Sequence, residues 1–343
     1  MNLFIRVLIF FFLISNLNAD ASKKAAIVID YTNGNKILFS DRSIESRFPA
    51  SITKLMTIYI LFDSIKKGKI TLNTKFKVSR LACNQMPSKL GLKVGEKISV
   101  LNLIKALFVK SANDAAVVAA EGIAGSVTNF CSLMNRKGKM LGMKNTNFVN
   151  PSGVPNKKQK SCARDLARLG IALYRDFPQY RHLFCLKQFA YKSKIYNTHC
   201  KILHWYKGAD GAKTGYINAS GYNLLVTAIR YNKVGKSKRL FVVVMGGDTA
   251  KARDMYAAQL MNKYFKDYQI TNKIKNLKGA KSSLLAQIDK KEILDQIVIE
   301  DDSIFIENTK NNSKPKMSEL LDKLYENNEE DIKEEESIHI PAT

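Results

Sequence analysis

Histidine and paired cysteine are scarce in this chain of 343 residues. None of its four histidines lies in a GxSxG-like or HExxH setting, which argues against a Ser-His-Asp hydrolase and a zinc peptidase. Its five cysteines are odd in number and form no CxxC pair, so we expect neither a metal site nor a redox motif. An ordinary core or surface role is favoured for the histidines, and only His199 is singled out for attention.

Long apolar runs are also lacking, apart from one near the start of the chain. Residues 7–14 are apolar, Arg6 precedes them, and small residues follow at Ala19 and Ala21. This pattern is typical of a signal peptide and is too short for a membrane-spanning helix. We therefore expect residues 1–21 to be removed and the protein to be exported to the periplasm. An uncleaved signal that anchors it in the inner membrane stays open as the alternative.

Acidic side chains are scarce in most of the chain. The sequence has 55 lysines and arginines against 30 aspartates and glutamates, a net charge of +25, and half of the acidic residues follow Lys291. This asymmetry predicts a basic folded domain over residues 22–266 and an acidic, partly disordered extension over 267–343. A basic domain attracts anionic polymers and membrane surfaces, so peripheral membrane association stays open, although a coding bias toward lysine is slightly favoured. The export signal argues against nucleic acid, and the oligomeric state is not predicted.

Three short motifs are present in the order that a serine–lysine enzyme needs. They are Ser51-Ile52-Thr53-Lys54, Ser111-Ala112-Asn113 and Lys213-Thr214-Gly215. The first pattern, SxxK, also occurs at residues 64–67 and 313–316 and means little alone, whereas KTG occurs once. The combination of SxxK, SxN and KTG is the signature of class A β-lactamases and penicillin-binding proteins.

The spacing of the first motif has a physical reason. Pro49 suits the start of a helix, so Ser51 would lie in the first turn with Lys54 three residues later on the same face. A serine becomes a nucleophile only beside a base, and a lysine serves as that base when burial or a neighbouring cation lowers its pKa. Lys213 would be that cation. The setting of KTG indicates an exposed turn that leads into a buried strand.

The chain resembles the serine-type D-alanyl-D-alanine carboxypeptidases, which are low-molecular-mass penicillin-binding proteins. The likeness runs from about residue 25 to about residue 265 and includes the opening hairpin, the NPSGV segment at 150–154 and the SCARD segment at 161–165. Two departures stand out, since the family commonly has His where this chain has Tyr216, and an Asn-rich stretch where it has residues 198–203. The resemblance also favours buried free thiols at Cys162 and Cys200, and no disulfide is predicted.

The resemblance implies a role for each motif residue. Ser51 would attack the D-Ala-D-Ala carbonyl, Lys54 would take and return the proton, and Ser111 would relay protons. The remaining implied residues bind substrate. Asn113 would hold the substrate amide, Lys213 and Thr214 its terminal carboxylate, Gly215 would leave room for its backbone, and the N–H groups of Ser51 and Tyr216 would form the oxyanion hole.

The implied function is removal of the terminal D-alanine from peptidoglycan stem pentapeptides in cell-wall remodelling, with β-lactam antibiotics as covalent inhibitors. The family chemistry needs no metal or organic cofactor. Two alternatives stay open. A class A-like β-lactamase needs a glutamate to activate water, and Glu121 is the only glutamate between Asn113 and Lys213. A non-catalytic cell-wall-binding protein would keep the fold without the reaction.

The expected fold is α+β and β-lactamase/transpeptidase-like, with an antiparallel sheet flanked by helices. A hairpin over residues 25–30 and 36–40 precedes a mainly helical subdomain that extends to about residue 186. Strands over 224–231 and 239–247 and a helix over 249–265 follow. The early and late strands would share one sheet, and the site would form where helix, loop and edge strand meet.

Overall fold

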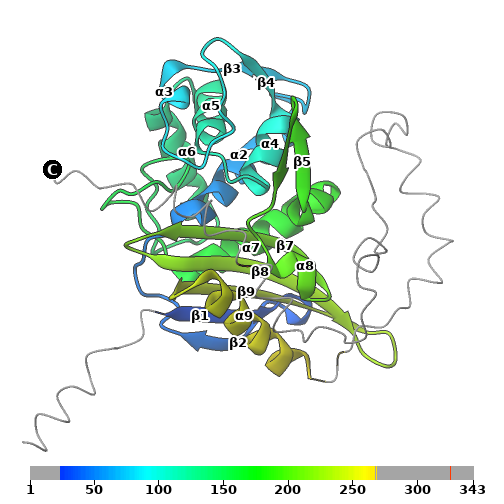
Figure 1. Ribbon diagram of the computed structural model, residues 1–343. Helices are drawn as coiled ribbons and strands as arrows, with labels where there is room; N and C mark the ends of the chain where they lie inside the picture. The colour runs from blue at the N-terminus through cyan, green and yellow to red at the C-terminus, as the bar shows by residue number, and fades with distance from the viewer. Residues whose placement is uncertain (1–23, 267, 269–324, 326–343) are drawn as a thin grey trace, which may run out of the picture.

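The computed structural model describes residues 24–266, Tyr268 and Tyr325. Its centre is an antiparallel sheet with the strand order β2-β1-β9-β8-β7 (Figure 1). The N-terminal hairpin therefore pairs with the last strand of the domain, and β7 lies at an edge. The strands of this sheet are β1 (Ala25–Asp30), β2 (Lys36–Asp41), β7 (Ala209–Ile217), β8 (Gly221–Tyr231) and β9 (Ser237–Gly247).

Helices cover both faces of the sheet, which explains why its inner strands carry buried apolar residues on both faces. Successive side chains of a strand point to opposite faces. In β1, Ile27 packs into the core on the side of helix α7 (Ala163–Asp176), whereas Val28 packs into a second core on the side of helix α9 (Ala250–Phe265). Helix α9 begins after Thr249, whose hydroxyl caps it by accepting a hydrogen bond from the Ala252 N–H.

A helical region stands beside the sheet, at the top of Figure 1. Its amphipathic helix α4 buries residues at helical spacing, such as Leu103, Ile104 and Leu107, while most of α5 is buried on all sides. The burial of α5 fixes the position of its first residues, which belong to the SxN motif. The helices of this region are α2 (Lys54–Lys66), α3 (Arg80–Cys83), α4 (Val100–Phe108), α5 (Asn113–Ala124) and α6 (Val127–Met140).

The α+β fold class and the pairing of early with late strands are confirmed. Two small sheets go beyond the sequence prediction, because strands of three or four residues are too short to show a period. One pairs β3 (Lys75–Lys77) with β4 (Lys97–Ser99), and the other pairs β5 (Gln188–Tyr191) with β6 (Lys194–Asn197). Short helices precede β5 and β7, namely the 3-10 helix η4 (Pro178–Cys185) and α8 (Ile202–Trp205).

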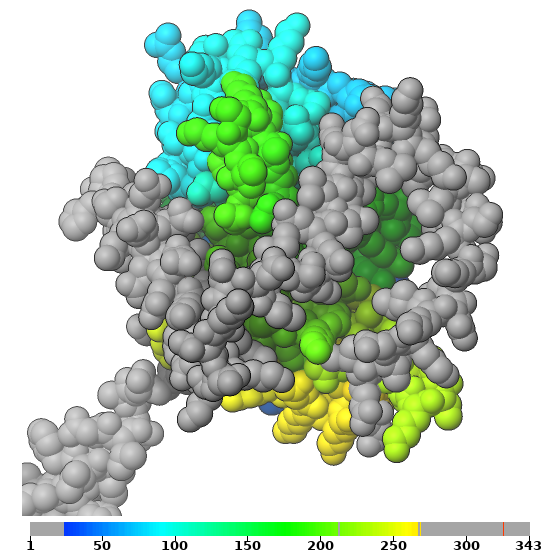
Figure 2. All heavy atoms as spheres, turned by 45° about the vertical axis from the view of Figure 1, so that its right-hand side comes forward, coloured from blue at the N-terminus to red at the C-terminus, as the bar shows by residue number. Residues whose placement is uncertain are grey.

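The β5–β6 hairpin lies against the helical region, as the central green column of Figure 2 shows. The Tyr191 hydroxyl donates a hydrogen bond of 2.5 Å to Glu96, and the Tyr196 hydroxyl donates one of 3.0 Å to the Leu90 carbonyl. The hairpin therefore ties the segment before β7 to the loop that follows α3.

The predicted signal peptide and nearly all of the predicted acidic extension lie outside the described residues. Both assignments stay predictions. Within the described part of the chain, no single helix is long and apolar enough to cross a membrane, and α5 and α6 pass that test only as a pair bent by 85°.

Candidate active site

Ser51 lies in a tight turn with an unusual backbone just before it. The turn is a 3-10 helix, η3 (Ala50–Thr53), and α2 starts at Lys54. Ala50 has a φ of +47°, a left-handed conformation that costs free energy for a residue with a side chain. Gly153, at a φ of +89°, packs so closely that a Cβ atom there would lie 1.9 Å from the Ala50 carbonyl oxygen. The NPSGV segment therefore holds the backbone that presents Ser51.

Lys54 is fully buried beneath Ser51, at the helical spacing that the sequence predicts. Its Nζ donates hydrogen bonds of 2.7 Å to Ser51 Oγ and 2.7 Å to the Ser152 carbonyl oxygen. Thr57, one turn further along α2, donates to the Pro151 carbonyl at 2.6 Å. These bonds place the amine within direct proton-transfer distance of the serine oxygen.

Ser111 and Lys213 form a second serine–lysine pair. Lys213 Nζ donates a hydrogen bond of 2.9 Å to Ser111 Oγ and one of 3.0 Å to the Thr214 carbonyl oxygen. Both side chains are buried, Lys213 at 1% exposure and Ser111 at 5%. Ser111 has a φ of +58°, so it is a second strained residue at the site. The SxN and KTG motifs, about a hundred residues apart, thus meet directly.

The KTG motif is not in an exposed turn, so that part of the sequence interpretation is wrong. Lys213-Thr214-Gly215 lies inside β7 and pairs with β8, and the Lys213 and Thr214 side chains are buried. A Cβ atom at Gly215 would lie 2.9 Å from the Ser51 backbone nitrogen. The missing side chain therefore gives room to the η3 turn that carries Ser51. A contact of Gly215 or Thr214 with substrate stays a prediction.

Asn113 and Asp114, the first residues of α5, hold the loop that faces Ser51. The Asn113 side-chain amide donates to the Met86 and Pro87 carbonyls at 2.9 and 3.0 Å. The Asp114 carboxylate is buried and accepts from the backbone N–H groups of Leu90, Gly91 and Leu92, as well as from Ala115. With its N–H₂ donors engaged, Asn113 presents its oxygen as an acceptor.

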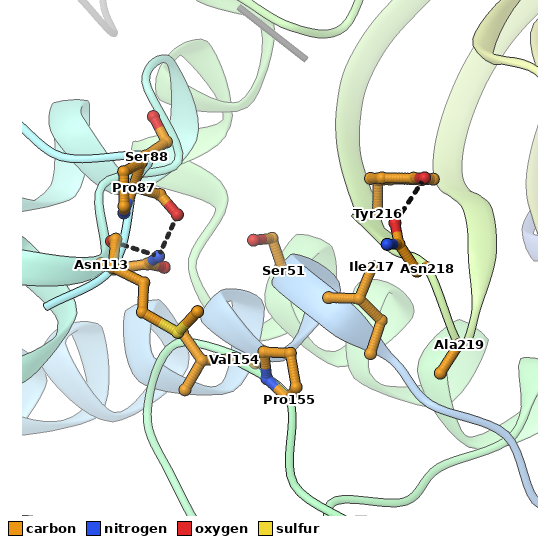
Figure 3. Close-up of a pocket in the computed structure, with 12 residues that line it drawn as sticks. Ser51, Pro87, Ser88, Asn113, Val154, Pro155, Tyr216, Ile217, Asn218 and Ala219 are labelled. Carbon is orange, nitrogen blue, oxygen red and sulfur yellow. Dashed lines mark hydrogen bonds between the residues drawn. The ribbon is translucent and has the colours of Figure 1, made fainter. Parts of the chain in front are cut away.

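These elements enclose a pocket around Ser51 (Figure 3). Asn113, Pro87 and Ser88 stand on one side of Ser51, Tyr216 and Asn218 on the other, and Val154 and Pro155 between them. The Tyr216 hydroxyl donates to Asn218 at 2.8 Å, and its ring packs against Tyr222 with centroids 4.3 Å apart. These contacts hold Tyr216 in the wall of the pocket, at the position where the family commonly has His.

Several residues that line the pocket belong to none of the three motifs. The wall at residues 86–88 is irregular and carries no recognisable pattern. Gly153 belongs to the NPSGV segment noted above. A glycine after Pro-Ser is typical of a turn that needs a positive φ, and this is the sequence signal that could have identified it. The pocket is lined by Ser51, Met86, Pro87, Ser88, Asn113, Gly153, Val154, Pro155, Tyr216, Ile217, Asn218 and Ala219.

His199 lies just before α8, near the lysines of the site. Its Nε2 is buried and has no hydrogen-bond partner among the described residues. Burial, followed by the charges of Lys110 and Lys213, lowers the pKa of His199 to about 3, so the ring is neutral at physiological pH. Cys162 and Cys200 are buried free thiols, as predicted, and burial raises the pKa of Cys162 to about 11.

A family model described as D-alanyl-D-alanine carboxypeptidase matches residues 14–249. The chain belongs to this family. The match covers all three motifs and the elements that bring them together, so the resemblance drawn from the motifs is confirmed.

Relatives with this name occur in Haemophilus influenzae and Bacillus subtilis. The chain is 35% identical over 248 residues to D-alanyl-D-alanine carboxypeptidase DacA of Haemophilus influenzae, which covers 71% of this chain and 62% of the relative. It is 33% identical over 251 residues to DacF of Bacillus subtilis, with 72% and 63% covered. The chain therefore spans less than two thirds of the length of these relatives.

Solved structures give the same fold. Penicillin binding protein 5 from Haemophilus influenzae superposes with a TM-score of 0.65 at 32% identity, covering 70% of each chain. Penicillin-Binding Protein D2 from Listeria monocytogenes in its cefotaxime-bound form superposes with a TM-score of 0.63 at 27% identity, covering 71% of this chain and 96% of that one. The penicillin-binding-protein architecture expected from the sequence is confirmed.

Proposed function

We propose that the protein is a serine hydrolase that removes the C-terminal D-alanine from peptidoglycan stem pentapeptides. The observation that supports this most directly is the 2.7 Å contact between Lys54 Nζ and Ser51 Oγ inside the pocket. In the neutral state Lys54 takes the Ser51 proton as Oγ bonds to the D-Ala-D-Ala carbonyl carbon. The C–N bond then breaks, D-alanine leaves with a proton on its amine, and water hydrolyses the acyl-enzyme.

The second pair supplies the proton path and the charge. Lys213 and Ser111 are in direct contact, and their side is where the departing amine would be protonated. Lys213 also brings a buried positive charge to the end of the pocket where the substrate carboxylate would bind. An extended peptide could lie along β7, which is an edge strand, with Asn113 accepting from its N–H on the other side.

Labelling with a fluorescent penicillin, followed by peptide mapping, tests the nucleophile. Ser51→Ala abolishes labelling, whereas the matched control Ser64→Ala, which also fits SxxK on the same helix, keeps it. Incubation with a pentapeptide muropeptide should release free D-alanine. Labelling at Ser64 or Ser111, or labelling without any D-alanine release, contradicts the proposal. The latter result would favour the non-catalytic cell-wall-binding alternative.

Recognition of the carboxylate by Lys213 and Thr214 has its own test. A charge-assisted hydrogen bond is roughly twice as strong as a neutral one. A substrate with an amidated C-terminus should therefore lose most of its kcat/KM relative to the free acid. Equal turnover of acid and amide contradicts this role.

The lifetime of the penicilloyl adduct separates this function from that of a β-lactamase. Glu121 lies eight residues after Asn113 on α5, about 12 Å along the helix, and does not line the pocket. Without a glutamate to activate water, the adduct on Ser51 should persist while D-alanine release from pentapeptide continues. Rapid turnover of penicillin without D-alanine release would instead favour the β-lactamase.

The place of action is also a proposal. The pattern of residues 1–21 supports export to the periplasm and a role in cell-wall remodelling. Cell fractionation with N-terminal sequencing of the mature protein tests it. A mature chain that retains Met1 and sediments with the inner membrane would favour the uncleaved anchor.

A further inference from the structure

Tyr325, far along the acidic extension, contacts the folded domain. Its hydroxyl donates a hydrogen bond of 2.5 Å to the Asp254 carboxylate and accepts one of 3.3 Å from the Trp205 indole N–H. Trp205 ends α8 and Asp254 lies in the first turns of α9, so the tyrosine spans two helices that cover the outer face of the sheet. Tyr325 itself is half-buried.

Tyr325 completes the hydrogen bonding of the Asp254 carboxylate. Its carboxylate is completely buried, and one oxygen accepts from Arg253 at 2.7 Å. The other oxygen accepts from Tyr325. With Tyr325 in place, both oxygens of the buried carboxylate have donors, so neither is left unsatisfied away from water. Burial, together with the Asp254 charge, raises the pKa of Tyr325, so the phenol keeps the proton that it donates.

The same network reaches the nucleophile turn. Arg253 donates at 3.2 Å to the Asn223 carbonyl, and the Asn223 side chain donates at 3.0 Å to the Phe48 carbonyl. Asn223 also accepts from the Gly246 N–H, which joins β8 to β9. Phe48 stands three residues before Ser51. A continuous series of hydrogen bonds therefore links Tyr325 to the backbone that presents the nucleophile.

We propose that Tyr325 is an anchor that fastens the acidic C-terminal extension to its own domain, in a site formed by Trp205 and Asp254. Tyr325 is the occupant of this site because its phenol is the donor to the buried carboxylate, and because it belongs to the same chain, so that binding is intramolecular. Through Asp254, the Tyr325 contact supports the hydrogen bonds of Arg253 and Asn223 that hold the Phe48 carbonyl ahead of Ser51. This inference goes beyond the proposed reaction and does not depend on it.

The full-length protein offers a direct reporter, since Trp205 is its only tryptophan. Tyr325→Ala should shift the fluorescence emission of Trp205 to longer wavelength and increase its quenching by acrylamide. Tyr325→Phe keeps the ring but removes a hydrogen bond to a charged group, and should lower the ratio of anchored to released protein by about tenfold or more. The matched control Tyr231→Ala, at an exposed tyrosine on the end of β8, should leave the emission unchanged.

Three results would overturn the anchor. These are a Trp205 emission in Tyr325→Ala identical to that of the parent, an equal shift in Tyr231→Ala, and a shift that depends on protein concentration, which would mean exchange between copies. The rate of penicillin attachment to Ser51 is the second measurement, and we expect a severalfold decrease in Tyr325→Ala. An unchanged rate would contradict the idea that Tyr325 supports the backbone before Ser51. The fluorescence result stands even if the proposed reaction is wrong.

Discussion

The two sides of the pocket are built in different ways. On one side, Ser51 lies in the η3 turn, Lys54 begins α2, and Lys213 lies on β7. Both lysines are buried among hydrogen-bond partners. On the other side, residues 85–92 have no regular secondary structure. That wall is held by the Asn113 and Asp114 side chains and by the β5–β6 hairpin.

The proposed chemistry and the shape of the pocket therefore depend on different parts of the fold. The proposed reacting groups lie on elements whose positions are fixed by the packed cores of the sheet and helices, which suits atoms that must stay within tenths of an ångström. The opposite wall depends on a few polar contacts, so changes there should alter substrate binding more than the chemical step.

Loss of the Lys54 amine should have the largest effect. Lys54→Met keeps the volume of the buried chain but removes the base, so the rate of penicillin attachment to Ser51 should fall by about 10²–10⁴-fold. Stopped-flow measurement with a fluorescent penicillin gives the rate. Lys66→Met, on the exposed face of the same helix, should react like the parent. A decrease of less than fivefold in Lys54→Met would mean that another group takes the proton.

The packing of Gly153 against the nucleophile turn should matter nearly as much. Both Gly153 and Gly142 have positive φ, but only a Cβ atom at Gly153 meets the backbone, at the Ala50 carbonyl. Gly142→Ala should lower the free energy of unfolding by about 1–2 kcal/mol through backbone strain alone. Gly153→Ala should lower it further and slow acylation. Urea unfolding and acylation rates check this, and equal behaviour of the two variants contradicts it.

The opposite wall is tested at Asp114. Asp114→Asn replaces an acceptor oxygen with an N–H₂ donor that faces backbone N–H groups, and we expect a loss of about 2–4 kcal/mol in the free energy of unfolding. Because the wall moves rather than the reacting groups, KM for pentapeptide should rise more than kcat falls. Glu45→Gln, at an exposed ion pair with Arg47, is the control and should change little. A decrease confined to kcat would mean that Asp114 affects the chemical step rather than substrate binding.

Acid sensitivity from His199 should be the smallest effect. Its folded-state pKa of about 3 lies below its unfolded value of about 6.5. In this pH range the unfolded chain therefore binds a proton at His199 and the folded protein does not. Stability is lost as pH falls from about 6.5 toward 3. Between pH 7 and pH 5 this amounts to about 1–2 kcal/mol. His199→Gln should lose less stability over that interval, as urea unfolding at the two pH values would show.

The sequence by itself determined the pairing of Ser51 with Lys54, the fold class and the family. Ser51 and Lys54 are three residues apart at a helix start, so local geometry alone brings them together. The apolar strands 224–231 and 239–247 and the opening hairpin predict a sheet, since strand periodicity is also a local property. The order of SITK, SAN and KTG indicated the family that the match over residues 14–249 shows.

Only the tertiary structure decided how the distant parts meet. The contact of Lys213 with Ser111 depends on β7 lying at the sheet edge beside the start of α5. The composition around KTG is typical of a turn and did not indicate this strand, because burial of a strand depends on the elements that pack against it. Residues 86–88 become a wall only through Asn113. Tyr325 finds Asp254 across 71 positions of the chain. Such pairings follow from long-range packing, which no local spacing in the sequence encodes.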